Sequence, residues 1–160
     1  MTKRVFLFVG VVAIAGAFAA SRADAGITFY PGASCVQAET TTPKISYMTA
    51  RAFSQSSTGA SFVCPAVQQG GRILGATVYG RDLHPAASVK CHAANQNQFD
   101  TAGSTTGTQS SGDAFTGNFT LSLGSLPAVV TPGSKVILCS MPPSLGMDGS
   151  SIGAYRVNEE

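Results

Sequence analysis

The stretch KVILCSMPP, residues 135–143, indicates a central β-strand. Val136–Cys139 is an unbroken apolar run that begins with two β-branched side chains and follows Gly133. A short apolar run between such breakers is typical of a strand that is buried on both faces. The two prolines must end the strand, because proline has no backbone N–H to donate to a sheet. Cys139, near the end of the run, is placed where a disulfide could tie this strand to another.

Further strand patterns lie on both sides of this stretch. Residues 115–123 are the clearest, because each odd-numbered position is apolar or glycine and each even-numbered position is polar. That alternation indicates a half-buried antiparallel strand. Residues 45–53 fit a strand or a short helix. Other strands are expected at Ser61–Cys64, Arg72–Arg81, Ser88–Ala94 and Ile152–Val157.

These patterns predict an all-β fold. No window of eleven residues after the N-terminal leader keeps a helical period, and Gly and Pro turns separate the strands. We therefore predict an antiparallel β-sandwich of seven or eight short strands stapled by disulfides, with an open β-barrel as the alternative. Within Arg72–Arg81, the period of two places Leu74, Ala76 and Val78 on one face and Tyr79 on the other.

The N-terminus has the three parts of a secretory signal peptide. A basic start (residues 1–4) precedes the uncharged run 5–20, and Ala23-Asp24-Ala25 follows as an A-x-A cleavage site. An uncleaved membrane anchor is disfavoured, because the run is shorter than the ~20 residues of a spanning helix. We predict removal of residues 1–25 and one domain over residues 26–160, in a secreted or periplasmic protein.

The charge balance argues against some partners. The chain has ten Lys and Arg against eight Asp and Glu, and the leader carries Lys3, Arg4, Arg22 and Asp24. Its removal leaves equal numbers of basic and acidic side chains. A neutral domain lacks the electrostatic footprint of a protein that binds nucleic acid or anionic lipid. We therefore expect neither a nucleic-acid nor a membrane partner for the mature form, and consider a surface or extracellular partner instead.

Four cysteines, Cys35, Cys64, Cys91 and Cys139, follow the leader. An even number in an exported chain favours two disulfides, and no pair has the C-x-x-C spacing of a zinc knuckle or a redox site. Three connectivities are possible. We favour Cys35–Cys64, which would pin a weak Gly-, Thr- and Pro-rich lead-in (residues 26–43), and Cys91–Cys139, which would join two core-facing positions.

Residues 97–113 are rich in Gln, Asn, Ser, Thr and Gly, and Phe99 is their one large apolar side chain. Such a segment lacks the apolar area that ordering requires. We predict a mobile surface loop within the domain.

Few residues are suited to catalysis. Gly149-Ser150-Ser151-Ile152-Gly153 matches G-x-S-x-G, but a hydrolase needs a helix after this motif and a later histidine. Both histidines, His84 and His92, precede it. With Asp82 they could form a metal site, since imidazole and carboxylate are suitable ligands. However, His84 also fits a turn, and His92 also fits a solvent-facing position on a strand. A carboxylate pair for glycoside hydrolysis would have to come from predicted loops, turns or the tail: Glu39, Asp82, Asp100, Asp113, Asp148, Glu159 and Glu160.

Sugar binding usually needs an exposed aromatic platform. The chain has no tryptophan, so Tyr79 and Tyr155 are the candidates. No cofactor is indicated by any motif.

Four short motifs resemble a set of small exported bacterial proteins: FVCP at 62–65, VKCHA at 89–93, LCSMPP at 138–143 and SSIGAYRVNE at 150–159. Those proteins share a C-P after an early strand, a mid-chain cysteine, a C-S-x-P near the end and a final S-Y-R-V-like strand. Ala154 is a departure from their usual Ser or Val. The resemblance implies export and a β fold, and it assigns no functional residues.

The sequence therefore predicts a non-enzymatic exported protein that acts as a binding module or as a surface or structural component. Two alternatives belong to other classes. One is a secreted hydrolase or small metalloenzyme that uses Asp82, His84 and His92. The other is a pilus- or coat-like subunit, which would self-assemble through an exposed edge strand.

Overall fold

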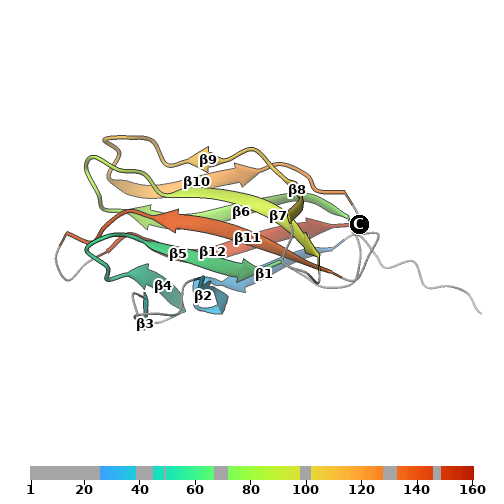
Figure 1. Ribbon diagram of the computed structural model, residues 1–160, viewed down its shortest axis with the longest axis horizontal. Helices are drawn as coiled ribbons and strands as arrows, with labels where there is room; N and C mark the ends of the chain where they lie inside the picture. The colour runs from blue at the N-terminus through green and yellow to red at the C-terminus, as the bar shows by residue number, and fades with distance from the viewer. Residues whose placement is uncertain are drawn as a thin grey trace, which may run out of the picture.

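A computed structural model describes residues 26–38, 45–48, 50–66, 72–97, 102–127, 133–145 and 149–160. Two six-stranded antiparallel sheets lie face to face, with their strands along the long axis of the molecule (Figure 1). The fold is therefore an all-β sandwich, as predicted. Apart from strands, the described residues include one 3-10 turn, η1 (Gly32–Ser34). Within the described ranges, no helix has the length and apolar character needed to cross a membrane.

The first sheet, called sheet A, has the order β10-β6-β12-β4-β3, and β1 also pairs with β12. One edge of β12 is shared: β4 pairs with Ser151 and Ile152, and β1 pairs with residues 154–158. The strands of sheet A are β1 (Ile27–Pro31), β3 (Ile45–Met48), β4 (Arg51–Ser54), β6 (Ile73–Asp82), β10 (Gly117–Leu123) and β12 (Ser151–Glu159).

The second sheet, sheet B, has the order β2-β5-β11-β7-β8, and β9 also pairs with β7. Its strands are β2 (Val36–Gln37), β5 (Ala60–Pro65), β7 (Lys90–Asn97), β8 (Ala102–Thr105), β9 (Gln109–Ser110) and β11 (Gly133–Met141). β11 lies between β5 and β7 and ends immediately before Pro142. The prediction of a central strand that the prolines terminate is confirmed.

The core fills the space between the sheets. The alternation expected for residues 115–123 is observed in β10, where Phe119, Leu121 and Leu123 are buried and the residues between them are exposed. They face sheet B residues such as Phe62 and Ile137. Removing these side chains from water is the main favourable contribution to folding.

Tyr155 of β12 joins the two sheets. Its side chain is fully buried, and its hydroxyl donates a hydrogen bond to the Pro65 carbonyl oxygen at 2.7 Å. Its ring stacks on Tyr30 with centroids 4.9 Å apart. Burial, with a smaller contribution from Tyr30, raises the pKa of Tyr155 above the usual range for tyrosine.

Both favoured disulfides are present. Cys35 and Cys64 have Cα atoms 4.0 Å apart, and Cys91 and Cys139 have Cα atoms 4.2 Å apart. Cys91 and Cys139 are direct cross-strand partners in β7 and β11. In the chain-entropy model, closing loops of 29 and 48 residues contributes roughly 3.5 and 4 kcal/mol.

The N-terminal segment is better ordered than the sequence suggested. Residues 27–31 form β1 on β12, and the chain then crosses to sheet B through η1, next to Cys35. The crossing passes so close to β12 that a Cβ on Gly32 would lie 2.0 Å from the Ile152 carbonyl oxygen. Only glycine allows this approach.

Three other expectations need correction. Residues 45–53 form a hairpin, β3 and β4, instead of one strand or a helix, and Ala50 in its turn has φ 67°. Leu74 is exposed and Ile73 is buried, because the pairing register of β6 with β12 shifts near Asn158. The described residues form twelve strands, more than the seven or eight predicted, since several are very short.

The polar segment 97–113, which was predicted to be a mobile loop, contains two short strands. β8 and β9 lie within it and pair with β7, and Thr106 Oγ1 accepts a hydrogen bond from the Ala93 N–H at 2.9 Å. Backbone and hydroxyl hydrogen bonds hold this segment where apolar burial is lacking. Residues 98–101 lie outside the described residues, and the mobility of the segment stays a prediction.

Candidate functional site

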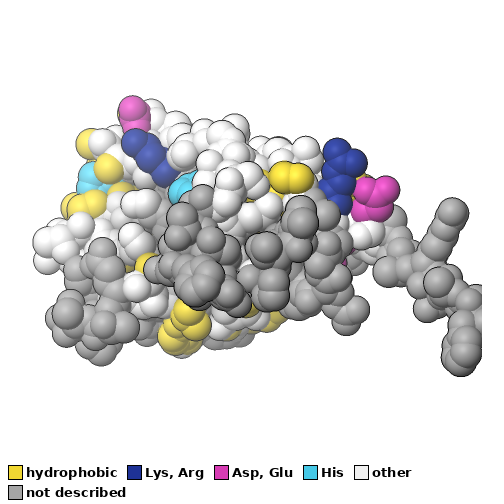
Figure 2. All heavy atoms as spheres, turned by 45° about the vertical axis from the view of Figure 1, so that its right-hand side comes forward, with side chains coloured by type: hydrophobic (Ala, Val, Ile, Leu, Met, Phe, Trp, Pro, Cys, Tyr) yellow, Lys and Arg dark blue, Asp and Glu magenta, His cyan; other side chains and the backbone are white. Residues whose placement is uncertain are grey.

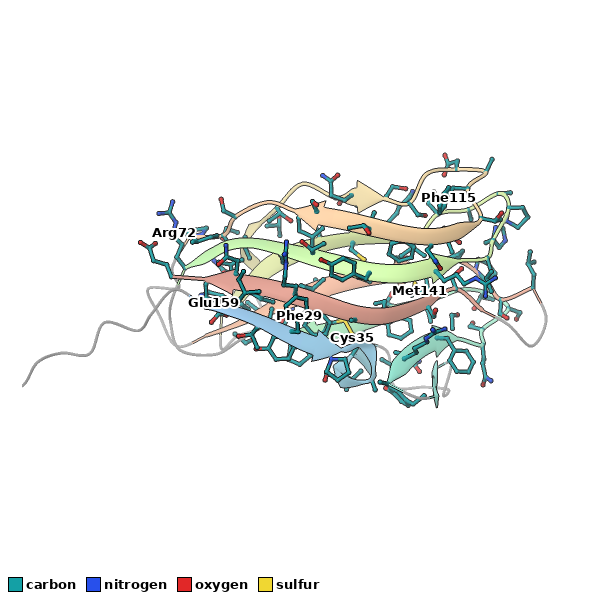
Figure 3. All side chains as sticks on the ribbon, turned by 180° about the vertical axis from the view of Figure 1, so that it is seen from behind. Phe29, Cys35, Arg72, Phe115, Met141 and Glu159 are labelled. Carbon is teal, nitrogen blue, oxygen red and sulfur yellow. A yellow bond between two sulfur atoms is a disulfide. The ribbon has the colours of Figure 1, made fainter. Side chains whose placement is uncertain are left out.

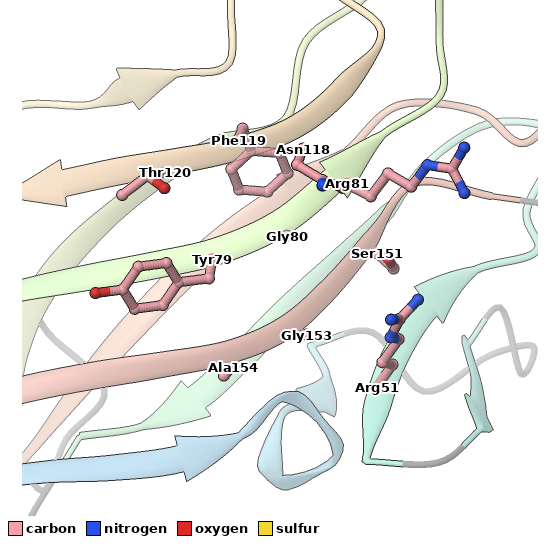
Figure 4. A pocket seen from close by; sticks show the side chains of 10 residues that line it. All are labelled: Arg51, Tyr79, Gly80, Arg81, Asn118, Phe119, Thr120, Ser151, Gly153 and Ala154. Carbon is pink, nitrogen blue, oxygen red and sulfur yellow. The ribbon is translucent and has the colours of Figure 1, made fainter.

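An open pocket of about 380 Å³ lies on the outer face of sheet A (Figure 4). Its residues come from β4, β6, β10 and β12 and the β-bulge of β12. Ten residues line it: Arg51, Tyr79, Gly80, Arg81, Asn118, Phe119, Thr120, Ser151, Gly153 and Ala154.

Strand alternation places the polar members of this set on one surface. Val78 points into the core, so Tyr79 points outward, and the same holds for Thr120 next to the buried Phe119. The sheet register aligns Thr120, Tyr79 and Ala154 in one row across β10, β6 and β12. Tyr79 is half-buried with small neighbours on either side, so one face of its ring is accessible from the pocket (Figure 4).

Gly80 allows the sheet to pack closely beneath the pocket. A Cβ at this position would lie 2.2 Å from the Ser151 carbonyl oxygen and 2.4 Å from the Phe119 ring. The Phe119 ring therefore packs over the backbone of β6 on the core side. A side chain at residue 80 would push β6 away from its neighbours and deform the pocket.

Asp82, next to Arg81, anchors one end of the pocket. It is fully buried, and its Oδ1 accepts hydrogen bonds from the His84 N–H at 3.0 Å and the Ser150 hydroxyl at 2.9 Å. Its Oδ2 accepts from the Val89 N–H at 3.1 Å and the Ser111 hydroxyl at 2.5 Å. One carboxylate thus joins the end of β6 to the residue before β7, the residue after β9 and the residue before β12.

The structure separates the two predicted aromatic platforms. Tyr79 lines the pocket, whereas Tyr155 is fully buried between the sheets. The proposal of Tyr155 as an exposed platform is wrong, because it lies on the core-facing side of β12.

Ser151 of the G-x-S-x-G motif lines the pocket but begins strand β12, so no helix follows it. His92 lies on β7 in sheet B, beside Leu138. His84 follows β6, and its Nδ1 accepts a hydrogen bond from the Ala86 N–H at 3.1 Å. The structure therefore does not form the strand–turn–helix that a hydrolase nucleophile requires.

The proposed metal ligands are not assembled either. Asp82 accepts four hydrogen bonds inside the protein. The part of the chain that the structure describes contains no group of three His, Cys, Asp or Glu suited to a metal ion.

Two of the carboxylates considered for glycoside hydrolysis, Asp82 and Glu159, are the last residues of β6 and β12 instead of lying in a loop or the tail. Glu39, Asp100 and Asp148 lie outside the described residues.

Charge is distributed differently on the two sides of the sandwich. In the view of Figure 2, basic and acidic side chains lie near each other at both ends of the molecule, with uncharged side chains between them. The outer face of sheet A is turned toward the viewer in Figure 3. Strand alternation places Arg51, Arg81 and Arg156 on this face. Arg156 donates a hydrogen bond to Thr77 Oγ1 at 3.3 Å, which ties it to the neighbouring strand.

Neither a protein-family model nor a curated protein matches the sequence. Several solved structures are similar in fold. One is a GH26-CBM35 β-(1,4)-mannanase of Podospora anserina, with TM-score 0.47 and 6% identity over 85% of this chain, which spans 28% of that chain. Another is the C-terminal CBM6 of the LamC enzyme of Zobellia galactanivorans, with TM-score 0.47 and 11% identity over 83% of this chain and 99% of that one.

A third is a family 35 carbohydrate-binding module of Clostridium thermocellum, with TM-score 0.37 and 10% identity over 83% of this chain and 98% of that one. These likenesses assign neither a ligand nor a residue role to this chain.

Proposed function

We propose that this protein is an exported, non-catalytic binding module that holds a saccharide in the pocket on the outer face of sheet A. The observation that carries the proposal is the half-buried ring of Tyr79 beside the exposed side chains of Asn118 and Thr120. A sugar ring presents an apolar C–H face, which suits an aromatic ring, and a rim of hydroxyls, which suits amide and hydroxyl side chains.

The position of these groups supports binding without rearrangement. Tyr79, Asn118 and Thr120 lie on paired strands, which hold side chains more rigidly than loops do. The ligand would therefore meet a preformed surface and would order few side chains on binding. An open pocket on the face of a sheet also suits one segment of a longer polymer.

Binding fits the pocket better than hydrolysis does. Its described lining contains no carboxylate and no imidazole, the usual groups for general acid–base catalysis. Ser151 has no neighbouring base among the lining residues, so it is proposed as a contact residue.

The test is affinity gel electrophoresis and calorimetry of residues 26–160 against a panel of neutral and acidic polysaccharides. Tyr79→Ala should weaken binding about tenfold or more, as expected for loss of an aromatic contact. The matched control is Phe29→Ala, because Phe29 is a 64% exposed aromatic on the same sheet, outside the pocket lining. Equal affinity of the Tyr79→Ala and wild-type proteins, or no binding to any polysaccharide, would refute the proposal.

Export is the second part of the proposal. The leader pattern of residues 1–25 and the two disulfides both suit an oxidising compartment outside the cytoplasm. Mass spectrometry of the protein from medium and periplasm should find a chain that starts at Gly26. An intact Met1 on the exported protein would contradict removal of the leader.

A structural subunit is the competing function, and the exposed apolar residues of β1 are the reason to test it. Ile27 and Phe29 are 57% and 64% exposed, and both lie on a strand at the edge of sheet A. Such an edge can pair with another chain. Concentration-dependent assembly on a sizing column that Phe29→Ala abolishes would favour this function.

A further inference from the structure

Two arginines lie at one end of the candidate pocket. Arg51 extends from β4 and Arg81 from β6, and both are exposed. Figure 4 shows their side chains on either side of Ser151, at the end of the pocket away from the Tyr79 ring. Within the described residues, neither guanidinium group takes part in an ion pair or a hydrogen bond.

Among the described residues, no carboxylate lines the pocket. Asp82 follows Arg81 but is buried inside the sandwich with both oxygens hydrogen-bonded, and Asp113 accepts a hydrogen bond from the Ser88 hydroxyl. Glu159 and Glu160 lie at the other end of β12 from Ser151, where Glu160 pairs with Arg72 at 3.8 Å. The pocket therefore has a positive end, although the chain without its leader is neutral as a whole.

Positive charge concentrated at one end of a pocket attracts an anionic group on a ligand. Guanidinium groups suit carboxylates, sulfates and phosphates in particular, because each presents several donors in a planar fork. Placed beside an aromatic ring and neutral hydrogen-bonding side chains, they match a ligand with one charged group and an adjoining uncharged ring.

We propose that the saccharide recognised here is acidic and that Arg51 and Arg81 bind its oxyanion, a carboxylate or a sulfate ester. The inference rests on the function proposed above and names the class of its ligand. The sugar ring next to the anion packs on Tyr79, and its hydroxyls face Asn118 and Thr120. Ser151, between the two arginines, is positioned to donate a hydrogen bond to the same anion.

Matched polysaccharides test the charge separately from the sugar. Polygalacturonate and its fully methyl-esterified form share a backbone and differ in the carboxylate, and a sulfated galactan and its desulfated form differ in the sulfate. We expect one charged polymer to bind about 10- to 100-fold tighter than its neutral counterpart, the effect of one or two charge-assisted hydrogen bonds. The pair that shows this difference identifies the anion.

The double variant Arg51→Gln/Arg81→Gln should abolish the preference for the charged polymer and keep the weaker affinity for the neutral one. The matched control is Arg72→Gln, which also removes an exposed arginine. Arg72 precedes β6 and Arg81 lies near its end, so the two are roughly 30 Å apart along an extended strand. Arg72→Gln should leave both affinities unchanged. All three positions are exposed, so the variants should unfold at the wild-type temperature.

The outcomes separate this inference from the function on which it rests. Equal, Tyr79-dependent binding of charged and neutral polymers would overturn the acidic ligand and keep saccharide binding. Absence of binding to all four polymers would overturn the acidic ligand, and absence of binding to every polysaccharide of the wider panel would overturn both. Binding of inorganic sulfate, or of DNA, as tight as that of the charged polymers and independent of Tyr79 would also overturn both, since it would show attraction of any anion.

Discussion

Replacing Asp82 by asparagine should lower the free energy of unfolding by about 3 kcal/mol. The carboxylate is fully buried and accepts four hydrogen bonds, two at each oxygen. Asparagine has the same shape but keeps only one acceptor oxygen, and its NH₂ group faces donors. If the NH₂ replaces Oδ2, the Ser111 hydroxyl can rotate to accept from it, whereas the Val89 N–H loses Oδ2 and keeps Ser111 Oγ, at 3.0 Å, as its acceptor. Two charge-assisted hydrogen bonds are then lost, at roughly 1.5–3 kcal/mol each, partly offset because no charge remains buried.

Alanine at this position should lower the free energy of unfolding further, by about 5 kcal/mol, because all four donors lose the carboxylate and a cavity forms, although the Val89 N–H keeps Ser111 Oγ as a second acceptor at 3.0 Å. Equilibrium urea unfolding at neutral pH, with both disulfides oxidised, measures these differences. The control is Glu160→Gln, since Glu160 is an exposed carboxylate in one 3.8 Å ion pair and should change stability by less than about 1 kcal/mol. An Asp82→Asn protein as stable as Glu160→Gln would show that the network does not stabilise the fold.

Three further predictions concern the sandwich. Tyr155→Phe should lower the free energy of unfolding by about 1–2 kcal/mol, because the Pro65 carbonyl loses its donor. Since burial raises the pKa of Tyr155 in the folded state, wild-type stability should fall as pH rises above about 10. Unfolding measured as a function of pH should lack this contribution in the variant. Ala50→Gly should raise stability by about 0.5–1 kcal/mol, because φ 67° strains alanine; thermal unfolding that shows no gain would contradict this. Hydrogen exchange should be faster in residues 102–113 than in β11, although both form sheet hydrogen bonds, because fewer apolar side chains cover that segment; equal protection would contradict it.

The periodicity of the chain was sufficient to predict the strands that form the core. β10 alternates along its whole length, and β11 is an apolar run that prolines terminate. The burial of each strand can therefore be predicted from its own residues. The cysteines could be paired from the same patterns, because Cys91 and Cys139 both occupy core-facing positions. Short strands such as β8 and β9 could not be predicted, since sheet hydrogen bonds to β7 hold them and their own composition is polar.

The residues of the candidate site could likewise be predicted only in part from the sequence. Tyr79 could be chosen as a platform from strand alternation, but so could Tyr155, because a sequence does not say which face of a two-sheet protein is turned toward the other sheet. Arg51, Arg81 and Ser151 are far apart in the sequence and meet only because β12 pairs with both β4 and β6. Local pattern therefore determined long strands such as β10 and β11, and long-range pairing decided the short strands and which side chains share a surface.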